Sequence, residues 1–125
     1  MSEIKISDLS IGDWVAIDGR PKRISSVLET PMGGMVRCQE QSITAFVEHI
    51  SPIPLTPEIL DKNGFVIVDE SADFQLYGSP ECSIFFTKGT VRYRLETPQA
   101  SVVCWNVHEL QHALRLAGVG KDIEV

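Results

Sequence analysis

Apolar and polar residues alternate through much of the first half of the chain, in short runs separated by turn residues. Alternation of this kind is typical of strands that bury one face. Runs of this type cover residues 14–17, 22–29, 35–40 and 43–50, with a shorter run at 4–6. Asp18-Gly19 lies between the first two full runs and predicts a hairpin, because both central residues of a type I′ turn need positive φ. These short strands predict a small barrel of the Src-homology-3 type at residues 1–51.

A proline-rich connector follows, and the pattern then changes. Thr56 precedes Pro57, and Gly64 comes seven residues later, which predicts a short helix from 57 to 62 or 63 with Thr56 as its N-cap. Further strand-like runs occupy residues 65–68, 74–77, 82–87, 90–96 and 101–105. Residues 52–125 are therefore predicted to form an antiparallel meander with two helices, and the whole chain an α+β protein of mostly antiparallel strands.

The last long segment predicts a helix at residues 107–117. Val107, Leu110, Leu114 and Ala117 recur at helical spacing and mark one buried stripe. Asn106 and Glu109 have the spacing of a capping box, and Gly118 is a suitable terminating residue. Each residue at the start of this helix thus has a structural role available.

The same segment contains the string His108-Glu109-Leu110-Gln111-His112, which matches the H-E-x-x-H pattern of zinc proteases. In that pattern the two histidines bind the metal, and the glutamate is the general base. A third protein ligand is also needed, and only thirteen residues follow His112. Such a ligand would have to come from upstream, from His49, Cys82, Cys104 or a carboxylate. We expect a capping box rather than a catalytic centre, with no cofactor, and keep a zinc-dependent hydrolase as the alternative.

Charge changes the picture little. The net charge is −6, so a nucleic-acid backbone would be repelled at long range, and nucleic-acid binding is not expected. The alternative of a weakly nucleic-acid-associated barrel depends on Arg20, Lys22 and Arg23. Arg92 and Arg94 form a second small basic pair, for which a solvated strand face is the simpler interpretation.

The cysteines bear on the compartment. Cys38, Cys82 and Cys104 are odd in number, widely spaced and without a C-x-x-C pair, so buried thiols are expected rather than disulfides or a zinc knuckle. The N-terminal residues lack the apolar core of a signal peptide, and no run approaches transmembrane length. We therefore expect a cytoplasmic protein that does not bind membranes.

Three stretches carry a resemblance that spans the chain. They read LSIGDWVAIDGRPKRISSV, PIPLTPEILDKNGF and VHELQHALRLAGVGKDIEV. In these stretches the chain resembles small proteins of gut Bacteroidales genomes and their prophages. The resemblance implies a gene near phage or mobile-element genes, with no established activity and no assigned catalytic residues. Related members often read H-Q-L-Q-N where this chain has His108 to His112, so the resemblance implies no zinc chemistry.

The chain shows no readable Ser-His-Asp arrangement and no phosphate-binding glycine loop. We therefore expect a non-enzymatic interaction or accessory module of phage or mobile-element origin. Its partner would be another protein, and self-association stays open.

Overall fold

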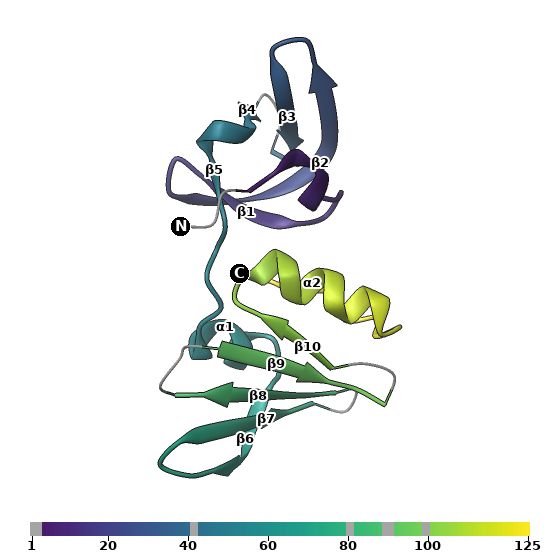
Figure 1. Ribbon diagram of the computed structural model, residues 1–125. Coiled ribbons are helices and arrows are strands. Elements are labelled where there is room, and N and C mark those ends of the chain that lie inside the picture. The colour runs from purple at the N-terminus through teal and green to yellow at the C-terminus, as the bar shows by residue number, and fades with distance from the viewer. Residues whose placement is uncertain (1–3, 41–42, 80–81, 89–91, 99–100) are drawn as a thin grey trace. The chain divides into compact units, whose positions relative to one another are not determined.

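The computed structural model describes residues 4–40, 43–79, 82–88, 92–98 and 101–125. The chain divides into two compact units, residues 1–53 and 54–125. Each unit has its own five-stranded antiparallel sheet, and both α-helices belong to the second unit (Figure 1). The α+β class with mostly antiparallel strands is therefore confirmed. Within the described residues neither sheet closes on itself, so the predicted closed barrel is not confirmed.

The sheet of the N-terminal unit has the strand order β4-β3-β2-β1-β5. Its elements are η1 (Ile6–Asp8), β1 (Trp14–Ile17), β2 (Arg20–Thr30), β3 (Gly33–Cys38), β4 (Thr44–Phe46), η2 (Val47–His49) and β5 (Ile50–Ser51). The predicted turn joins β1 to β2, and Asp18 and Gly19 have φ of 51° and 79°. The core of this unit is formed by Leu9, Val15, Ile17, Ile24, Val36, Cys38, Ala45 and Ile50.

One sequence prediction in this unit is wrong, and a second is narrowed, because the alternation at residues 4–6 allowed either a short first strand or a lead-in. Residues 4–6 are not a strand, because the chain turns into the 3-10 helix η1, in which Asp8 N donates to Lys5 O at 2.9 Å. Residues 43–50 are not one strand either. The 3-10 helix η2 separates β4 from β5, so the two strands reach opposite edges of the sheet. Ile43, Ala45 and Val47 keep a period of two up to η2, whereas Ala45 and Ile50, five residues apart, both reach the core only because the strand is broken between them.

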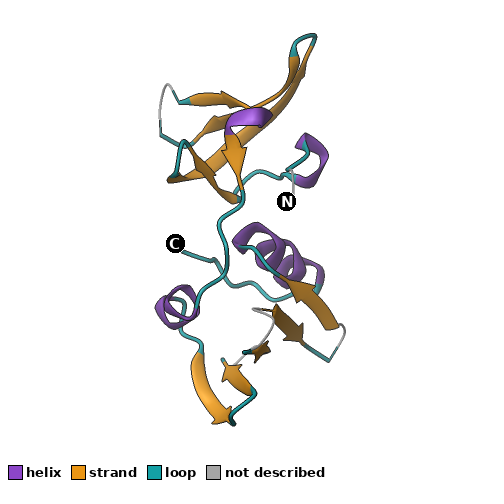
Figure 2. Cartoon of the chain, turned by 60° about the vertical axis from the view of Figure 1, so that its left-hand side comes forward, coloured by secondary structure: helices purple, strands orange, loops and turns teal. Residues whose placement is uncertain are grey.

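The sheet of the C-terminal unit has the consecutive strand order β10-β9-β8-β7-β6. Its elements are α1 (Pro57–Lys62), β6 (Val66–Glu70), β7 (Phe74–Gly78), β8 (Ser83–Thr87), β9 (Arg92–Glu96), β10 (Ser101–Cys104) and α2 (Val107–Leu116). Both helices lie on one side of this curved sheet (Figure 2). Thr56 caps α1 as predicted, since its Oγ1 accepts from Ile59 N at 3.2 Å.

Strand alternation divides the C-terminal sheet into two different faces. Tyr77, Ile84, Tyr93 and Leu95 belong to the inner face and are all at most 3% exposed. Leu76, Phe85 and Arg94 lie opposite one another on the outer face and are only half-buried. The unit therefore has its core on the inner face.

The alternation of Ile123, Glu124 and Val125 is compatible with a short edge strand, but these residues form no strand. Asn63 binds the backbone of Glu124 twice, donating from Nδ2 to its carbonyl oxygen at 2.7 Å and accepting from its amide at Oδ1 at 2.7 Å. Ile123 is buried next to this contact. The side chain of Asn63 thus makes the two hydrogen bonds to the backbone of Glu124 that a neighbouring strand would otherwise make. Thr90 and Val91, the first two residues of the predicted strand at 90–96, fall outside the described residues.

Candidate functional site

The start of α2 shows what the residues of the H-E-x-x-H string do. Glu109 Oε1 accepts hydrogen bonds from the amides of Trp105 and Asn106 at 3.0 and 2.9 Å, and from Asn106 Nδ2 at 3.1 Å. Asn106 and Glu109 form the predicted capping box. A carboxylate oxygen that accepts three bonds at a helix N-terminus stabilises the helix there. The geometry thus gives Glu109 a local structural role.

The two histidines of the string lie close together on α2. Their ring centroids are 5.8 Å apart, and the rings meet edge to face. His49, the suggested third ligand, belongs to η2 of the other unit, where its Nε2 lies 3.8 Å from Glu48 Oε1. Among the residues that the structure describes, no group of three or more His, Cys, Asp or Glu side chains could hold a metal ion.

The cysteine thiols are poorly suited to nucleophilic chemistry. Burial raises the pKa of Cys104 to about 12, and the nearby Glu109 adds to the effect. Burial also raises the pKa of Cys38, an effect that Lys22 opposes. Because the thiolate is the nucleophilic form, both groups stay protonated and unreactive near neutral pH. Cys38, Cys82 and Cys104 are all buried, and none forms a disulfide.

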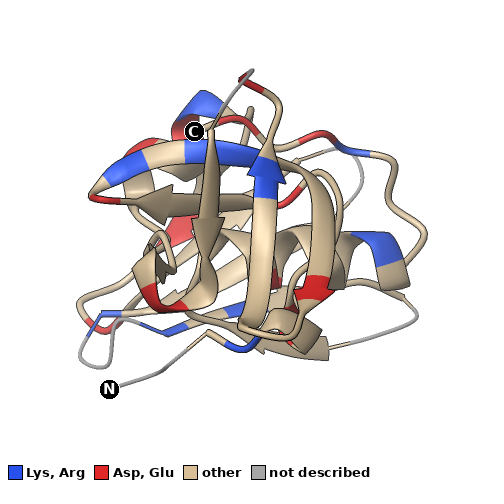
Figure 3. Cartoon of the chain, turned by 90° about the horizontal axis from the view of Figure 1, so that it is seen from above, with Lys and Arg blue, Asp and Glu red and all other residues tan. Residues whose placement is uncertain are grey.

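The two predicted basic groups are engaged with neighbouring residues. Lys22 Nζ lies 2.8 Å from Glu40 Oε2, and Arg23 Nε donates to Gly12 O at 3.0 Å. Arg94 is paired with Glu96 and stacks over Phe85 at 5.1 Å. In Figure 3 the basic positions at the start of β2 lie next to one another. The pairing of Lys22 with Glu40 and of Arg94 with Glu96 reduces the positive charge that either group could offer to a phosphate backbone.

Each unit has an open hollow. The hollow in the N-terminal unit measures 550 Å³ and lies between the β1–β2 turn and the start of β4, with Arg20 and Lys22 on its wall. The hollow in the C-terminal unit measures 430 Å³ and is lined by Ser79, Cys82 and Glu96 among others. Its Ser79 Oγ lies 3.8 Å from Cys82 Sγ. Neither wall brings together the nucleophile, base and orienting group that a catalytic site needs.

The most distinctive surface is the β6 edge of the C-terminal sheet. All five residues of β6 are exposed. Val66, Ile67 and Val68, here called the edge triplet, are 57%, 49% and 60% exposed. Among the described strands β6 pairs only with β7, so backbone groups on its other side lack a strand partner next to the apolar side chains, and the Glu70 amide is instead bonded to Asp69 Oδ1 at 2.9 Å.

The edge triplet continues into an apolar area on the outer face. We call Val66, Val68, Phe74, Leu76 and Phe85 the outer patch. Phe74 and Phe85 stack at a centroid distance of 4.9 Å. A Cβ built on Gly78 would lie 3.2 Å from Val68 Cγ1, so Val68 lies over Gly78 on this face. Asp69 lies beside Leu76 and Arg94 beside Phe85 on the same face, so the apolar residues are bordered by charged ones. An exposed apolar surface with a polar border marks an interaction site more often than a catalytic one.

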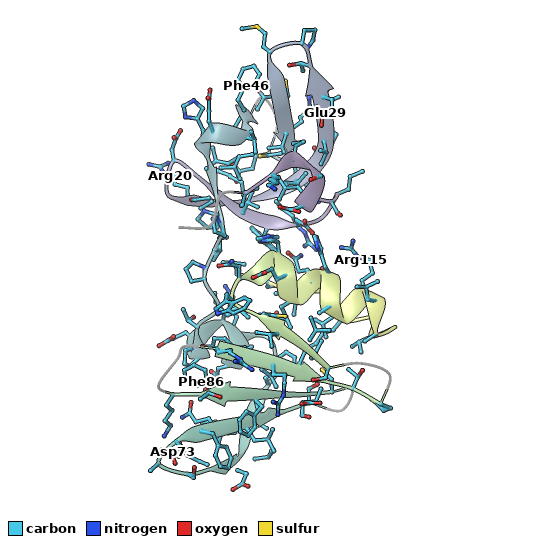
Figure 4. The ribbon with its side chains drawn as sticks, in the orientation of Figure 1. Arg20, Glu29, Phe46, Asp73, Phe86 and Arg115 are labelled. Atoms are coloured by element: carbon cyan, nitrogen blue, oxygen red, sulfur yellow. The ribbon has the colours of Figure 1, made fainter. Side chains whose placement is uncertain are left out.

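Acidic residues end the apolar edge. Asp69 and Glu70 complete β6, and Asp73 lies at the turn into β7 (Figure 4). Glu70 Oε2 accepts from Gln75 Nε2 at 2.6 Å and lies 3.5 Å from Lys88 Nζ. The hydrogen bond from Gln75, followed by the charge of Lys88, lowers the pKa of Glu70. The edge is thus apolar over its first three residues and charged beyond them.

The sequence did not reveal this surface. Residues 65–68 were predicted to be a strand, and four consecutive apolar residues there are typical of a strand buried on both faces. The edge position follows from the strand order, which the local pattern does not encode. No protein-family model matches this sequence, and neither a curated protein nor a solved structure matches it.

Proposed function

We propose that this chain is a non-enzymatic interaction module whose docking surface is the β6 edge together with the outer patch. The observation that carries the proposal is the edge triplet, three β-branched residues that are 49–60% exposed on a sheet edge. Folded proteins usually blunt such edges with charge, proline or a covering element. An edge left apolar over three residues favours pairing with another strand.

The rest of the chain supports a binding role over a catalytic one. Glu109, the proposed base of the zinc alternative, is occupied in capping α2. The thiols of Cys38 and Cys104 have raised pKa values. An accessory role in a phage or mobile element is part of the proposal and follows from the sequence resemblance. A cytoplasmic location is also part of it, supported by three buried cysteines outside any disulfide.

We also infer that the N-terminal unit is a small barrel of the Src-homology-3 type. The long strand β2 supports this inference, because it pairs with β1 in its first part and with β3 in its second. The register shifts between Ile24 and Ser26, which is where β2 passes from its pairing with β1 to its pairing with β3. Bends of this kind fold a sheet over its own core.

Neither helix of the described chain has the length and apolar character that crossing a membrane needs.

Site-specific photo-crosslinking in the native host tests the interaction role. A photoreactive amino acid replaces Ile67 on the β6 edge in one variant and Leu116 in a control. Leu116 is 84% exposed on α2 and so has comparable access to neighbouring proteins. We expect defined cross-linked products from position 67 and none from position 116. Equal products from both positions, or none from position 67, would refute the β6 edge as the docking surface.

A further inference from the structure

We propose that the partner of the β6 edge is a second copy of this chain. In this arrangement β6 pairs antiparallel with β6 of the second copy, about a two-fold axis that passes Ile67. The inference rests on the proposed function and names the occupant of the same surface. The pairing joins the two C-terminal sheets into one continuous ten-stranded sheet, five strands from each copy.

A β-bulge determines the register of this pairing. Val66 pairs with Gly78 and Ile67 with Tyr77, but the next pair is Asp69 with Leu76, so Val68 is the extra residue. Val66 therefore lies on the outer face with Val68, which covers Gly78. Ile67 lies on the inner face beside Tyr77, and Glu70 lies on the inner face beside Gln75.

Directly opposite residues of an antiparallel pair point to the same face. An axis at Ile67 places Val66 opposite Val68 of the second copy, outer face against outer face. It also places Ile67 opposite its own counterpart on the inner face. An axis at Val68 would set Val66 against Glu70 and Ile67 against Asp69, and both pairs mismatch in face. Within the edge triplet, the axis at Ile67 matches every opposite pair in face, and each member meets an apolar residue. The matched pairing ends there, because the next pair, buried Phe65 with Asp69, differs in face.

The acidic residues favour the same arrangement. Each copy carries a net charge of −6 and has Asp69 and Glu70 directly after the edge triplet. A parallel pairing would bring the acidic ends of both strands together. The antiparallel pairing about Ile67 sends them to opposite ends of the shared strands, beyond the apolar pairs. Like charges facing each other across strands are destabilising, so the antiparallel arrangement avoids that cost.

The outer patch extends the contact beyond the backbone. In the chosen register, Val66 and Val68 of each copy form two symmetry-related pairs on the outer face. Cross-strand pairs of β-branched side chains are among the favourable contacts of sheets. Gly78 lies behind the valines on β7, whereas Leu76 lies opposite Asp69 and continues to Phe85 on β8. The contact on the outer face is therefore formed by the valines themselves, which meet their counterparts about the axis as a self-complementary two-fold interface requires.

Sedimentation equilibrium over a range of protein concentrations tests the association. We expect the full chain to form a dimer and Val68→Lys to be monomeric, because an edge lysine blocks strand pairing. The matched control is Leu116→Lys, which adds the same charge at a residue that is 84% exposed. It should remain a dimer. A monomeric wild type, or a dimer that Val68→Lys leaves intact, would overturn the proposal.

Disulfide trapping tests the register. Opposite residues have Cα atoms about 4.5–5.5 Å apart, which suits a disulfide. Ile67→Cys should therefore give a covalent dimer on mild oxidation. Val66→Cys should not, since the two positions 66 are two residues out of step and about 8 Å apart. The native cysteines are buried, which keeps the background low. Trapping by Val66→Cys instead of Ile67→Cys would refute the axis at Ile67.

The effect of salt on association distinguishes a second copy of the chain from a partner of opposite charge. Two acidic copies repel one another, so added sodium chloride should strengthen the dimer. Weakening by salt would contradict the proposal, because it indicates a partner attracted by charge.

The photo-crosslinking experiment distinguishes failure of the second-copy proposal from failure of the docking surface itself. Products from position 67 that contain only foreign proteins would end the second-copy proposal while leaving the docking surface in place.

Discussion

The two edges of the C-terminal sheet are covered to very different extents. At the β10 edge, Leu55 N donates to Trp105 O at 3.0 Å, and Pro54 forms an isolated bridge with Asn106. The helix α2 begins directly after this strand and packs against it, and Cys104 is fully buried. At the β6 edge all five residues are exposed. One edge is completed by the chain itself, and the other is open.

The difference arises from what the chain places next to each strand. The connector before α1 and the helix α2 both return to β10. The helix α1 leads into β6 through Gly64, and the chain then turns back along β7. Exposed β-branched residues at β6 therefore cannot be explained by packing within the sheet. This contrast is the reason for assigning the docking surface to β6, and it can be tested from both sides.

The largest expected effect concerns the covered edge. Leu110 and Leu114 are each 1% exposed on the buried stripe of α2. Leu110→Ala or Leu114→Ala should reduce the free energy of unfolding by about 2–5 kcal/mol, from lost burial and the cavity left behind. Urea denaturation measures this change. Leu116→Ala is the matched control on the same helix and should change stability by less than about 0.5 kcal/mol. Similar losses in all three variants would show that the stripe is wrongly placed.

The second effect is a loss of stability at alkaline pH. Burial raises the pKa of Cys104 from 9.0 to about 12. Burial, followed by the influence of Tyr77, raises the pKa of Tyr93 from 10.0 to about 12. Folding therefore favours the protonated forms. Their stabilising contribution is complete below the unfolded pKa values and is lost as pH rises toward 12. Each group contributes a slope of at most about 1.4 kcal/mol per pH unit.

Urea unfolding at several pH values between 7 and 11 measures this slope. Cys104→Ala should flatten it above pH 9, because one of the two groups is removed. At the open edge, Glu70 gives the opposite pH dependence of stability. Because its pKa is lowered in the folded protein, its contribution is present at neutral pH and is lost in acid. The contribution is small because the carboxylate is fully exposed to solvent. An unchanged alkaline slope in Cys104→Ala would contradict the burial of this thiol in the folded state.

Local signals in the sequence predicted much of the fold. The caps at Thr56 and Asn106 and the turn at Asp18-Gly19 all hold, because each depends on residues within a few positions of one another. The strands of the C-terminal meander were found within a few residues of their bounds. The break at η2 was missed because Ile43, Ala45 and Val47 keep a period of two up to the first residue of η2, although β4 and β5 lie on opposite edges of the sheet.

The candidate site could not be predicted in the same way. A run such as Phe65 to Val68 has the same appearance in a central strand and in an edge strand. Only the order of strands places Val66, Ile67 and Val68 at an edge. The bulge at Val68 is likewise a property of the pairing with β7. By contrast, the capping role of Glu109 was predictable, since its partner Asn106 is three residues away.

The smallest effect concerns the N-terminus of α2 at the covered edge. Glu109→Ala removes the acceptor of three hydrogen bonds and a favourable charge in the first helical turn. We expect a loss of about 0.3–1 kcal/mol in the free energy of unfolding. Glu109→Gln should lose less, because glutamine can also occupy this position of a capping box. Thermal or urea unfolding of the two variants beside the wild type measures the difference.

Zinc content decides between capping and the metal alternative at the same residues. If Glu109 only caps α2, protein purified without chelator should contain no stoichiometric zinc, and His112→Ala should leave the metal content unchanged. Elemental analysis measures both. About one zinc per chain that is lost in His112→Ala would show that His108 and His112 bind metal. Retention of that zinc in His49→Ala would then exclude His49 as the third ligand. Glu109 could be a general base only if its carboxylate left the amides of Trp105 and Asn106, so zinc bound by the histidines alone would leave the capping box in place, whereas catalysis would require its loss.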